Sequence, residues 1–308
     1  MPEVIFVQDH LVQRGGAERG LLSMLKAAPG AAVHVAFYRP EQCYPEFAEV
    51  DVRPFPLDRI GPLSRRHRLA MPLLAPAFSS HRVDADVVIC GTSGWAQGVR
   101  TTGRKVVYFY ALTRWLYERD AYLGARGPLA RFGVAALAPL LERWDRRTVA
   151  SGHRFLTEGT EMRDRLREIY GIEAEIVPLP MALDAAGAQR PVDGLEPGFF
   201  LCASRLMPYK NIDVVLEAFA RLPEQRLVVA GDGPEETRLR AIAPRNATMF
   251  GLAQDDQLRW LYANCAAVVT AAFEPFGLTP IEGAAYGKPT VALRAGGFID
   301  TVIDGRTG

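Results

Sequence analysis

The chain has 308 residues, of which 49% are hydrophobic and 23% are charged, and its formal net charge at pH 7 is +1. This length allows two domains, each large enough to bury its own core. A net charge so close to zero argues against bulk binding of nucleic acid. The cysteines form no C-x-x-C pair, which favours free buried thiols in a reducing cytoplasm over disulfides or a zinc site: Cys43, Cys90, Cys202 and Cys265.

The sequence shows no signal for export or membrane insertion. The N-terminal residues MPEVIFVQDH indicate a strand without a charged leader, so we expect no signal peptide. The longest apolar run, residues 132–141, contains Pro139 and is too short to span a bilayer. We therefore expect a cytoplasmic protein that is not an integral membrane protein.

Short apolar, β-branched runs alternate with helical patterns along the whole chain. In the first half, the predicted strands are residues 3–7, 32–38, 86–90, 105–110 and 154–157. In the second half, they are residues 198–203, 227–230, 247–250, 267–270 and 290–293. Residues 212–222 place five apolar side chains on one helical face: Ile212, Val215, Leu216, Phe219 and Leu222. This alternation predicts an α/β fold with parallel sheets covered by helices.

A change in composition divides the predicted strands into two groups. Residues 178–198 are rich in Pro, Gly and Ala and have no strong period, as is typical of a linker. We therefore predict an N-terminal domain at 1–178, a linker at 179–197 and a C-terminal domain at 198–308. Both domains are predicted to be doubly wound and Rossmann-like, with a cleft between them.

The most informative segment, residues 271–301, places Glu274 and Glu282 eight positions apart around a Phe-Gly-Leu turn. Glu274 follows a predicted strand, and in open α/β sheets ligands bind outside the carboxyl ends of the strands. Gly277 lets the backbone approach a ligand closely. Carboxylates suit sugar hydroxyls, and the N–H groups at a helix N-terminus suit a phosphate. The segment therefore predicts a site for a sugar diphosphate.

Glu282 has a second interpretation, as part of a helix cap. Thr279, Pro280 and Glu282 fit the N-cap, N1 and N3 positions of a helix, and T-x-x-E is the pattern of a capping box. The residues alone leave both interpretations open, because one carboxylate can serve either purpose.

Two cations, Arg205 and Lys210, lie in a predicted turn between a strand end and a helix start. Together they could neutralise a diphosphate, Arg205 bidentately and Lys210 as a point charge. The alternative is a pair of solvated loop charges, and their place in the same predicted domain as Glu274 favours a function. Gly231 opens a G-D-G turn after the next strand, and we count it with the predicted sugar-diphosphate site, although a tight turn needs glycine anyway.

Other motifs argue against several chemistries. Gly15 and Gly16 form a glycine turn after the first strand, but without G-x-G-x-x-G or P-loop spacing they predict no dinucleotide or ATP site. Asp84 and Asp86 resemble a metal-binding D-x-D but precede a strand, so we interpret them as solvated residues at a strand entry. The histidines have no metal-ligand spacing, and the nucleophile elbow G-x-S-x-G is absent from the sequence.

Residues 64–78, SRRHRLAMPLLAPAF, combine basic and apolar side chains. Such a segment can rest on an anionic membrane surface or beside a lipid-linked acceptor. Pro72 and Pro76 are expected to break it, and a helix that covers the sheet explains it as well. We favour the covering helix and keep peripheral membrane contact as an alternative.

Several segments of the second half resemble the donor domain of retaining GT-B glycosyltransferases of the family 4 type, also called glycosyl transferases group 1. They are SRLMPYKNIDVVLEAF, VVAGDGPEE, FGLAQDDQLRWLYANC, FEPFGLTPIEGAAYGKPTV and AGGFIDTVIDGRTG. The first half is similar through VQDHLVQRGGAERGL and YFYALTRWLYERD. The resemblance implies a GT-B fold and transfer of a hexose, with retention, from a nucleoside-diphosphate sugar to a glycan or lipid-linked acceptor.

The resemblance also implies roles for single residues. Arg205 and Lys210 match the basic pair that binds the donor diphosphate, and Glu274 matches the carboxylate that engages the sugar hydroxyls. Glu282 matches the residue that holds the ribose. Further positions match glycine turns and backbone amides that face the donor: Gly15, Gly16, Phe276, Gly277 and Leu278. No metal or other cofactor is expected, because Arg205, Lys210 and a helix N-terminus can stabilise the leaving diphosphate.

The sequence departs from this family at two places. Many relatives have a histidine in a segment of the type H-T-P-x-R near the transferred sugar. Here YALTR has Tyr110 in that place and keeps Arg114, and we place both on the acceptor side. The chain stops at Gly308, where relatives continue, so the C-terminal domain is expected to be incomplete.

Two other functions stay open at this point. One is a sugar-nucleotide 2-epimerase on the same fold, and the other is a sugar-nucleotide-binding protein without catalytic activity. GDP-, UDP- and ADP-linked donors are all compatible with the motifs, and mannose is slightly favoured as the sugar. The expected location is the cytoplasm, and a position at the inner face of the membrane stays open as an alternative.

Overall fold

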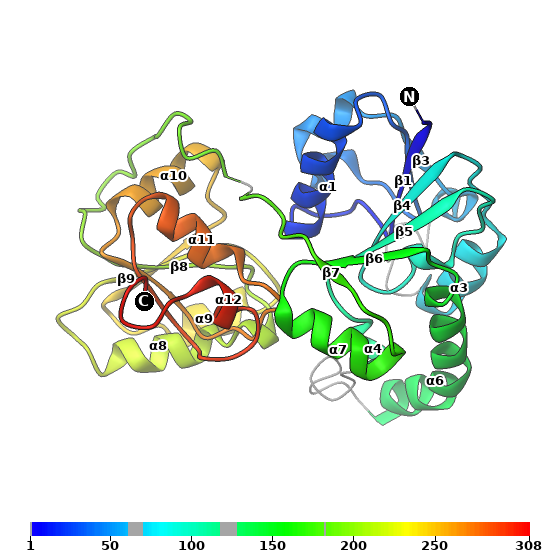
Figure 1. Ribbon diagram of the computed structural model, residues 1–308. Coiled ribbons are helices and arrows are strands. Elements are labelled where there is room, and N and C mark those ends of the chain that lie inside the picture. Colours follow the sequence, from blue (N-terminus) through cyan, green and yellow to red (C-terminus); the bar gives the residue numbers. More distant parts are fainter. Residues whose placement is uncertain (1, 61–69, 118–127, 182) are drawn as a thin grey trace. The chain divides into compact units, whose positions relative to one another are not determined.

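The computed structural model describes the whole chain apart from residues 1, 61–69, 118–127 and 182 (Figure 1). The chain divides into two compact units, Met1–Pro180 and Met181–Gly308, which we call unit 1 and unit 2. Each unit contains a parallel sheet with helices on both faces. The predicted α/β class with two doubly wound domains is therefore confirmed.

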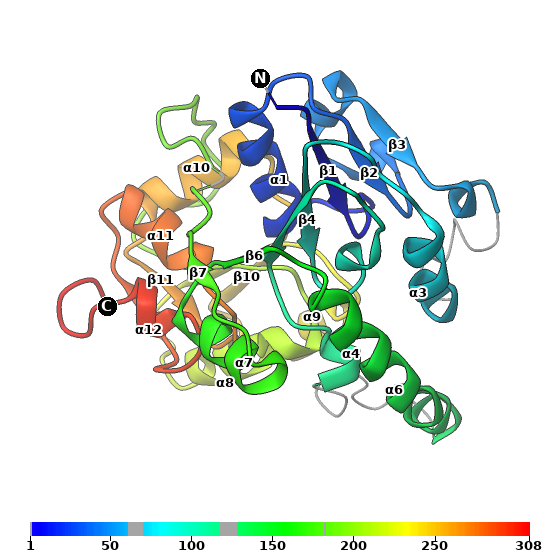
Figure 2. The same ribbon diagram turned by 45° about the vertical axis from the view of Figure 1, so that its right-hand side comes forward.

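The described part of unit 1 contains a seven-stranded parallel sheet in the order β3-β2-β1-β4-β5-β6-β7 (Figure 2). Its strands are β1 (Val4–Gln8), β2 (Val33–Val35), β3 (Val52–Pro54), β4 (Val87–Thr92), β5 (Arg104–Phe109), β6 (Arg154–Thr157) and β7 (Glu175–Ile176). Its α-helices are α1 (Gly16–Ala27), α3 (Met71–Ser80), α4 (Arg114–Tyr117), α6 (Pro128–Val149) and α7 (Thr160–Tyr170).

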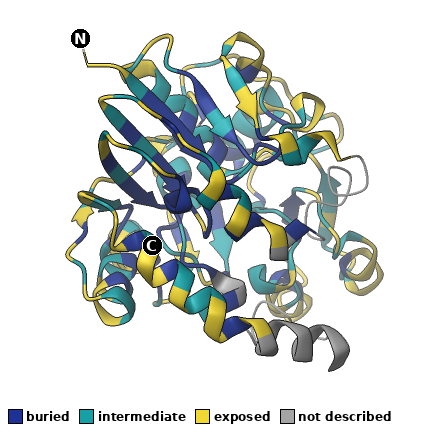
Figure 3. Ribbon diagram, turned by 90° about the vertical axis from the view of Figure 1, so that its right-hand side faces the viewer, coloured by how far each residue is buried: buried dark blue, intermediate teal, exposed yellow. Residues whose placement is uncertain are grey.

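Successive residues of β1 point into two different cores, as the twofold period of a strand requires. Ile5 and Val7 join the cluster that Phe78 of α3 covers. Phe6 points the other way and packs with Leu21 of α1. Figure 3 shows the result, with buried residues concentrated on the central strands of this sheet. The central strands β1, β4 and β5 are therefore largely buried.

The described part of unit 2 contains a five-stranded parallel sheet in the order β10-β9-β8-β11-β12. Its strands are β8 (Phe200–Ala203), β9 (Leu227–Ala230), β10 (Ala247–Gly251), β11 (Ala267–Thr270) and β12 (Thr290–Ala292). Its helices are α8 (Ile212–Ala220), α9 (Glu236–Ile242), α10 (Asp255–Asn264), α11 (Leu278–Ala285) and α12 (Phe298–Thr301). Helices α8 and α9 cover one face of the sheet, and α10 and α11 cover the other (Figure 1).

Each of the ten predicted strand segments overlaps an observed strand. The sequence missed β3, which is largely exposed, and β7, which has two residues, because neither has an apolar run. Leu222 was wrongly placed on the buried helical face: α8 ends at Ala220, and Leu222 is 49% exposed. The prediction that Pro76 breaks its segment was also wrong, because α3 continues through it.

Several other sequence predictions can be checked in the described residues. All four cysteines lie there, and they are buried and free, as predicted. Asp84 and Asp86 are exposed before β4, where they pair with Arg82 and with the backbone N–H of Glu3. Residues 64–69 of the basic segment lie outside the description, whereas Met71–Ser80 forms a covering helix. No helix in the described ranges is long and apolar enough to cross a membrane.

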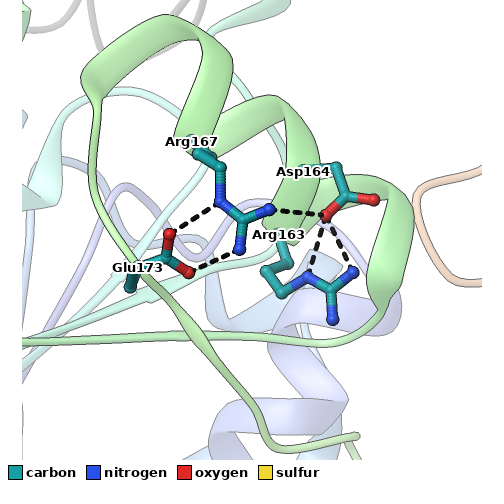
Figure 4. Close-up of polar contacts among 4 residues, drawn as sticks. All are labelled: Arg163, Asp164, Arg167 and Glu173. Atoms are coloured by element: carbon teal, nitrogen blue, oxygen red, sulfur yellow. Dashed lines mark hydrogen bonds and ion pairs between the residues drawn. The ribbon is translucent and has the colours of Figure 1, made fainter.

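The surface of α7 carries a chain of ion pairs near its C-terminus (Figure 4). Arg167 Nε lies 2.6 Å from Glu173 Oε1 and holds the pKa of that carboxyl below its usual range. Asp164 pairs with Arg163 at 2.8 Å and with Arg167 at 4.0 Å. Exposed pairs of this kind are screened by water and contribute little to stability. The helix is therefore held mainly by its buried face.

Candidate functional site

The strand order of unit 2 reverses between β8 and β11. From β8 the chain moves outward through β9 to β10, and it then returns to β11 on the opposite side of β8. In open α/β sheets, ligands bind at such a reversal, outside the carboxyl ends of the two flanking strands. The loop after β8 carries Arg205 and Lys210, and the loop after β11 carries Glu274. The topology therefore brings together the three residues predicted to act on the donor.

The charged side chains of these two loops are in contact. Lys210 Nζ forms an ion pair with the carboxylate of Glu274, and the two side chains are only 16% and 19% exposed. Arg205 is oriented by Tyr209, whose hydroxyl lies 3.0 Å from Arg205 Nη2. Lys210 Nζ lies 5.4 Å from the centroid of the same tyrosine ring. Two cations and one carboxylate thus share a partly dehydrated site with a positive balance of charge, which suits a diphosphate.

Asn211 joins the two loops through its side chain. It has φ 52° and ψ 39°, and it is the one non-glycine residue with positive φ in the described part of the chain. Its Nδ2 donates to the carbonyl oxygen of Ala271 at 2.9 Å. Strained backbone of this type is often found at functional sites. The sequence analysis missed Asn211, although asparagine tolerates the left-handed region better than most residues, which was an available signal.

The loop that carries Glu274 is held by a second loop, residues 295–298. The Gly297 N–H donates to the Glu274 carbonyl oxygen at 2.8 Å, and a Cβ on Gly297 would overlap the backbone of Phe276. Gly277 adopts φ 87° at the start of α11, a conformation that requires glycine. Phe276 is buried, so its ring anchors the turn. The predicted Phe-Gly-Leu turn therefore has a fixed shape.

The capping-box interpretation of Glu282 was wrong. Helix α11 begins at Leu278 after Gly277, and in this described segment no side chain caps it. Glu282 Oε2 instead accepts a hydrogen bond from the Tyr262 hydroxyl at 2.6 Å. Tyr262 is fully buried on α10, and burial, together with the neighbouring Glu282, raises its pKa well above the usual value. The phenol therefore stays protonated and donates to the carboxylate.

Gly231 lies where the turn after β9 meets the loop of Arg205. It has φ 146°, and a Cβ at this position would overlap the carbonyl oxygen of Ser204. The Leu206 N–H also donates to the Asp232 carbonyl oxygen at 2.7 Å. This glycine is required by the close approach of two backbones, which supports the loop of Arg205 from behind.

Unit 1 has its own strand reversal, between β1 and β4, where the Asp9 carboxylate accepts hydrogen bonds from backbone N–H groups and from the Thr92 hydroxyl. The Asp9 carboxylate accepts N–H bonds from Ser93, Trp95 and Ala96 at 2.7, 3.0 and 2.7 Å. Burial raises its pKa to about 6, against the lowering effect of these bonds. Asp9 thus stabilises the turn after β4. The sequence analysis missed it because the partners are distant in the chain.

Tyr110 follows β5 at the same end of this sheet. Its ring is 6% exposed, and within the described residues its hydroxyl has no hydrogen-bond partner. Burial, and then the acidic neighbours Tyr108 and Glu158 among others, raises its pKa well above the usual value. Tyr110 is therefore a neutral hydroxyl at any physiological pH, unlike a histidine. Arg114 is the first residue of α4, and its side chain lies outside the described part of the structure.

The glycine turn of unit 1 opens α1 as predicted. Gly15 is the N-cap residue in an extended conformation, and Gly16 is the first helical residue. A Cβ on Gly15 would lie 2.6 Å from Oε2 of Glu18, a buried carboxylate of the first helical turn. An acidic group of the protein itself therefore already lies beside the N-terminus of this helix.

Comparison with known proteins shows that the part of the chain that contains this site matches a known family. Residues 189–308 match the family profile described as Glycosyl transferases group 1. Unit 2 thus carries a Glycosyl transferases group 1 domain. Glycogen synthase of Mycobacterium tuberculosis (strain CDC 1551 / Oshkosh) is 33% identical over 183 residues, which cover 54% of this chain and 43% of that protein. Alpha-1,3/1,6-mannosyltransferase ALG2 of Dictyostelium discoideum is 47% identical over 55 residues, 18% of this chain and 13% of that protein.

A solved structure resembles the chain over both units. Anabaena Alr3699/HepE in complex with UDP and glucose matches 98% of this chain and 84% of its own with a TM-score of 0.67, at 18% sequence identity. At this identity the similarity establishes the GT-B fold and no more. The chain spans less than half the length of each of these two curated relatives. The group 1 domain contains all the residues that meet at the reversal between β8 and β11.

Proposed function

We propose that this protein is a retaining hexosyltransferase of the family 4 type, which uses a nucleoside-diphosphate sugar and transfers the hexose to a hydroxyl of a glycan or lipid-linked acceptor. The observation that carries the proposal is the meeting of Arg205, Lys210 and Glu274 at the strand reversal of the group 1 domain. The names of the relatives and the UDP and glucose of the Anabaena structure support a nucleotide-sugar donor.

In the proposed mechanism, charge develops on the diphosphate as the bond to the sugar breaks. Arg205 binds phosphate oxygens through its planar fork, and Lys210 adds a compact charge beside it. Both are placed before the reaction begins, so they stabilise the leaving group without reorganising. The backbone N–H groups at the start of α11, near Gly277 and Leu278, add the positive end of a helix dipole. No metal or other cofactor takes part in this proposal.

The ion pair between Lys210 and Glu274 indicates where the donor sugar binds in the proposed mechanism. An incoming diphosphate replaces Glu274 as the partner of Lys210, because it carries more negative charge than one carboxylate. Glu274 then accepts hydrogen bonds from hydroxyls of the sugar. This exchange places the bond to be broken between the two loops that contain these residues.

The other parts of the proposal concern the donor, the acceptor and the location. We propose a UDP- or GDP-linked hexose, with ADP as a further candidate and mannose as a candidate sugar. The acceptor side is assigned to Tyr110 and Arg114 of unit 1, whose glycine turn, Gly15 and Gly16, belongs to the donor side. We place the protein in the cytoplasm, with peripheral contact to the inner face of the membrane, where lipid-linked and cell-envelope acceptors are found.

The donor is tested first by thermal shift against a panel of UDP-, GDP- and ADP-sugars. A ligand at 100 times its Kd stabilises the folded state by about 2.7 kcal/mol, so the preferred nucleotide should raise the Tm clearly. A protein that none of these compounds stabilises would contradict the donor assignment.

The cations are tested by Arg205→Ala and Lys210→Ala, each expected to lower kcat at least about 100-fold while the fold is retained. The matched control is Arg240→Ala in the same unit, because Arg240 pairs with Glu236 on the surface of α9, away from the strand reversal. Arg240→Ala should keep wild-type turnover. Unchanged turnover in Arg205→Ala or Lys210→Ala would refute the diphosphate role.

A further inference from the structure

We infer that Tyr262 is a positioning residue, which holds Glu282 in the orientation that binds the ribose hydroxyls of the donor nucleotide. The inference rests on the proposed function, since it needs a nucleotide in unit 2. It adds a residue from a different helix to the site: Tyr262 lies on α10, whereas Glu282 lies on α11. The argument starts from the hydrogen bond between the two side chains.

The two partners of this bond differ in mobility. Tyr262 is fully buried and packs among the core residues that cover one face of the sheet, so its hydroxyl has a fixed position. Glu282 is half-buried, and its side chain has several rotatable bonds. The distance of 2.6 Å between Tyr262 Oη and Glu282 Oε2 is typical of a strong, charge-assisted hydrogen bond. The core therefore sets the direction of the carboxylate.

A purely structural explanation is that a buried tyrosine hydroxyl needs some acceptor. Tyr286 argues against it. Its ring stacks on that of Tyr262, with centroids 5.8 Å apart and 7° between the planes. Yet the Tyr286 hydroxyl is buried and finds no hydrogen-bond partner among the residues that the structure describes. This part of the fold thus tolerates an unpaired phenol, so the bond from Tyr262 to Glu282 is not a requirement of packing.

The bond also removes Glu282 from its competing role. A glutamate in the first turns of a helix can turn back to the backbone N–H groups at the helix start. Here the carboxylate accepts a hydrogen bond from Tyr262, and α11 begins after Gly277 with no side-chain hydrogen bond at its N-cap. A carboxylate has about four acceptor sites, so the bond from Tyr262 uses only part of its capacity to accept hydroxyl donors. Two adjacent ribose hydroxyls are donors of the matching geometry.

The experiment compares binding of a nucleoside diphosphate and its 2′-deoxy counterpart by calorimetry, using UDP with dUDP and GDP with dGDP. A site that hydrogen-bonds a ligand hydroxyl discriminates strongly against the analogue that lacks it. We expect the wild type to bind the ribonucleotide about tenfold or more tightly than the deoxy form. Tyr262→Phe should reduce this ratio to about threefold or less, while Tyr286→Phe, the matched control, should keep the wild-type ratio.

The double-mutant cycle separates positioning from a general loss of stability. If Tyr262 acts through Glu282, then Glu282→Gln should abolish the preference for ribose, and adding Tyr262→Phe to it should change the ratio no further. Circular dichroism and Tm check that each variant folds. Tyr262→Phe is expected to fold, because the shape of the ring is kept and the half-buried Glu282 can hydrate.

Different failures have different meanings. A wild type that binds none of these nucleotides contradicts the proposed function itself. A wild type that binds ribose and deoxyribose forms equally overturns the ribose role of Glu282, and the inference with it. A Tyr262→Phe variant that binds with the full wild-type ratio overturns the inference and leaves the proposed function intact.

Discussion

At Asn211, which joins the two site loops in a left-handed conformation, we expect an unusual order of stability: the alanine variant should be less stable than the glycine variant. Asn211→Gly keeps a backbone that tolerates φ 52° but deletes the hydrogen bond to the Ala271 carbonyl oxygen, so we expect a loss of about 1–2 kcal/mol in the free energy of unfolding. Asn211→Ala deletes the same bond and keeps a Cβ in the left-handed region without the polar side chain that lets asparagine tolerate it, which costs about 1–2 kcal/mol relative to glycine. The alanine variant should therefore be the less stable by about 1 kcal/mol.

Urea unfolding, with hydrogen exchange to resolve the amides of unit 2, measures this order. The matched control is Asn264, whose Nδ2 donates to the Trp260 carbonyl oxygen at 2.9 Å and whose φ is negative at the end of α10. At Asn264 the ordinary order should hold, with the alanine variant at least as stable as the glycine variant. The reasoning is refuted if Asn211→Ala proves as stable as Asn211→Gly.

The same pair of variants reports on the site. Because both variants lose the contact between the two loops, both should raise the KM for the nucleotide sugar if this contact positions Arg205 and Lys210 against Glu274. A glycine variant with normal KM and lowered stability would show that Asn211 serves the fold alone.

Two further predictions concern a titrating carboxyl group and a glycine. Burial raises the pKa of Glu158 to about 8, so between its usual pKa and pH 8 the folded state keeps a proton that the unfolded chain releases, and stability falls as the pH rises. Glu158→Gln should remove this decline, so the variant should gain up to about 4 kcal/mol in the free energy of unfolding at pH 8 and nothing at pH 4. Urea titrations at both pH values measure this, and the prediction fails if the free energy of unfolding changes with pH by the same amount in the two proteins. Gly297→Ala should displace the loop of Glu274 and cost at least about 2 kcal/mol, because its Cβ overlaps the backbone of Phe276. Gly287→Ala, where φ is 68° and no atom lies within 4 Å, should cost only about 1 kcal/mol, and an equal loss in both variants would contradict the steric argument.

The sequence was sufficient to predict the elements that depend on local apolar patterns. All ten predicted strands have an observed counterpart, because each predicted segment contains a run of apolar side chains of which at least some enter a core. It failed where the pattern was weak, as in the two-residue β7, and where a helix ended earlier than its apolar face, as at Leu222. Helix α3 contains Pro76, which shows that packing of a buried face can outweigh the local penalty of a proline.

The sequence was sufficient to predict the charged residues of the candidate site but not the residues that hold them in position. Arg205, Lys210 and Glu274 are visible in sequence because charges directly after apolar strands are conspicuous. Tyr262 and Asn211 were missed, because each acts through a partner 20 or 60 residues away. Glu282 was ambiguous in sequence, since a cap and a ligand group need the same carboxylate. The structure excludes the cap, because α11 begins at Leu278 and the Glu282 carboxylate accepts from the phenol of another helix, a contact that no local pattern encodes.

The ion pair at the strand reversal explains how unit 2 can keep its site folded without a ligand. Lys210 and Glu274 are each less than a fifth exposed, and either charge alone at that depth would be costly to desolvate. Pairing them removes this cost but occupies both groups. A neutral sugar offers Lys210 no replacement for the carboxylate, whereas a diphosphate does. In the proposed mechanism, the nucleotide part of the donor is therefore the part that opens the pair, and Glu274 becomes available to sugar hydroxyls only in a molecule that carries both.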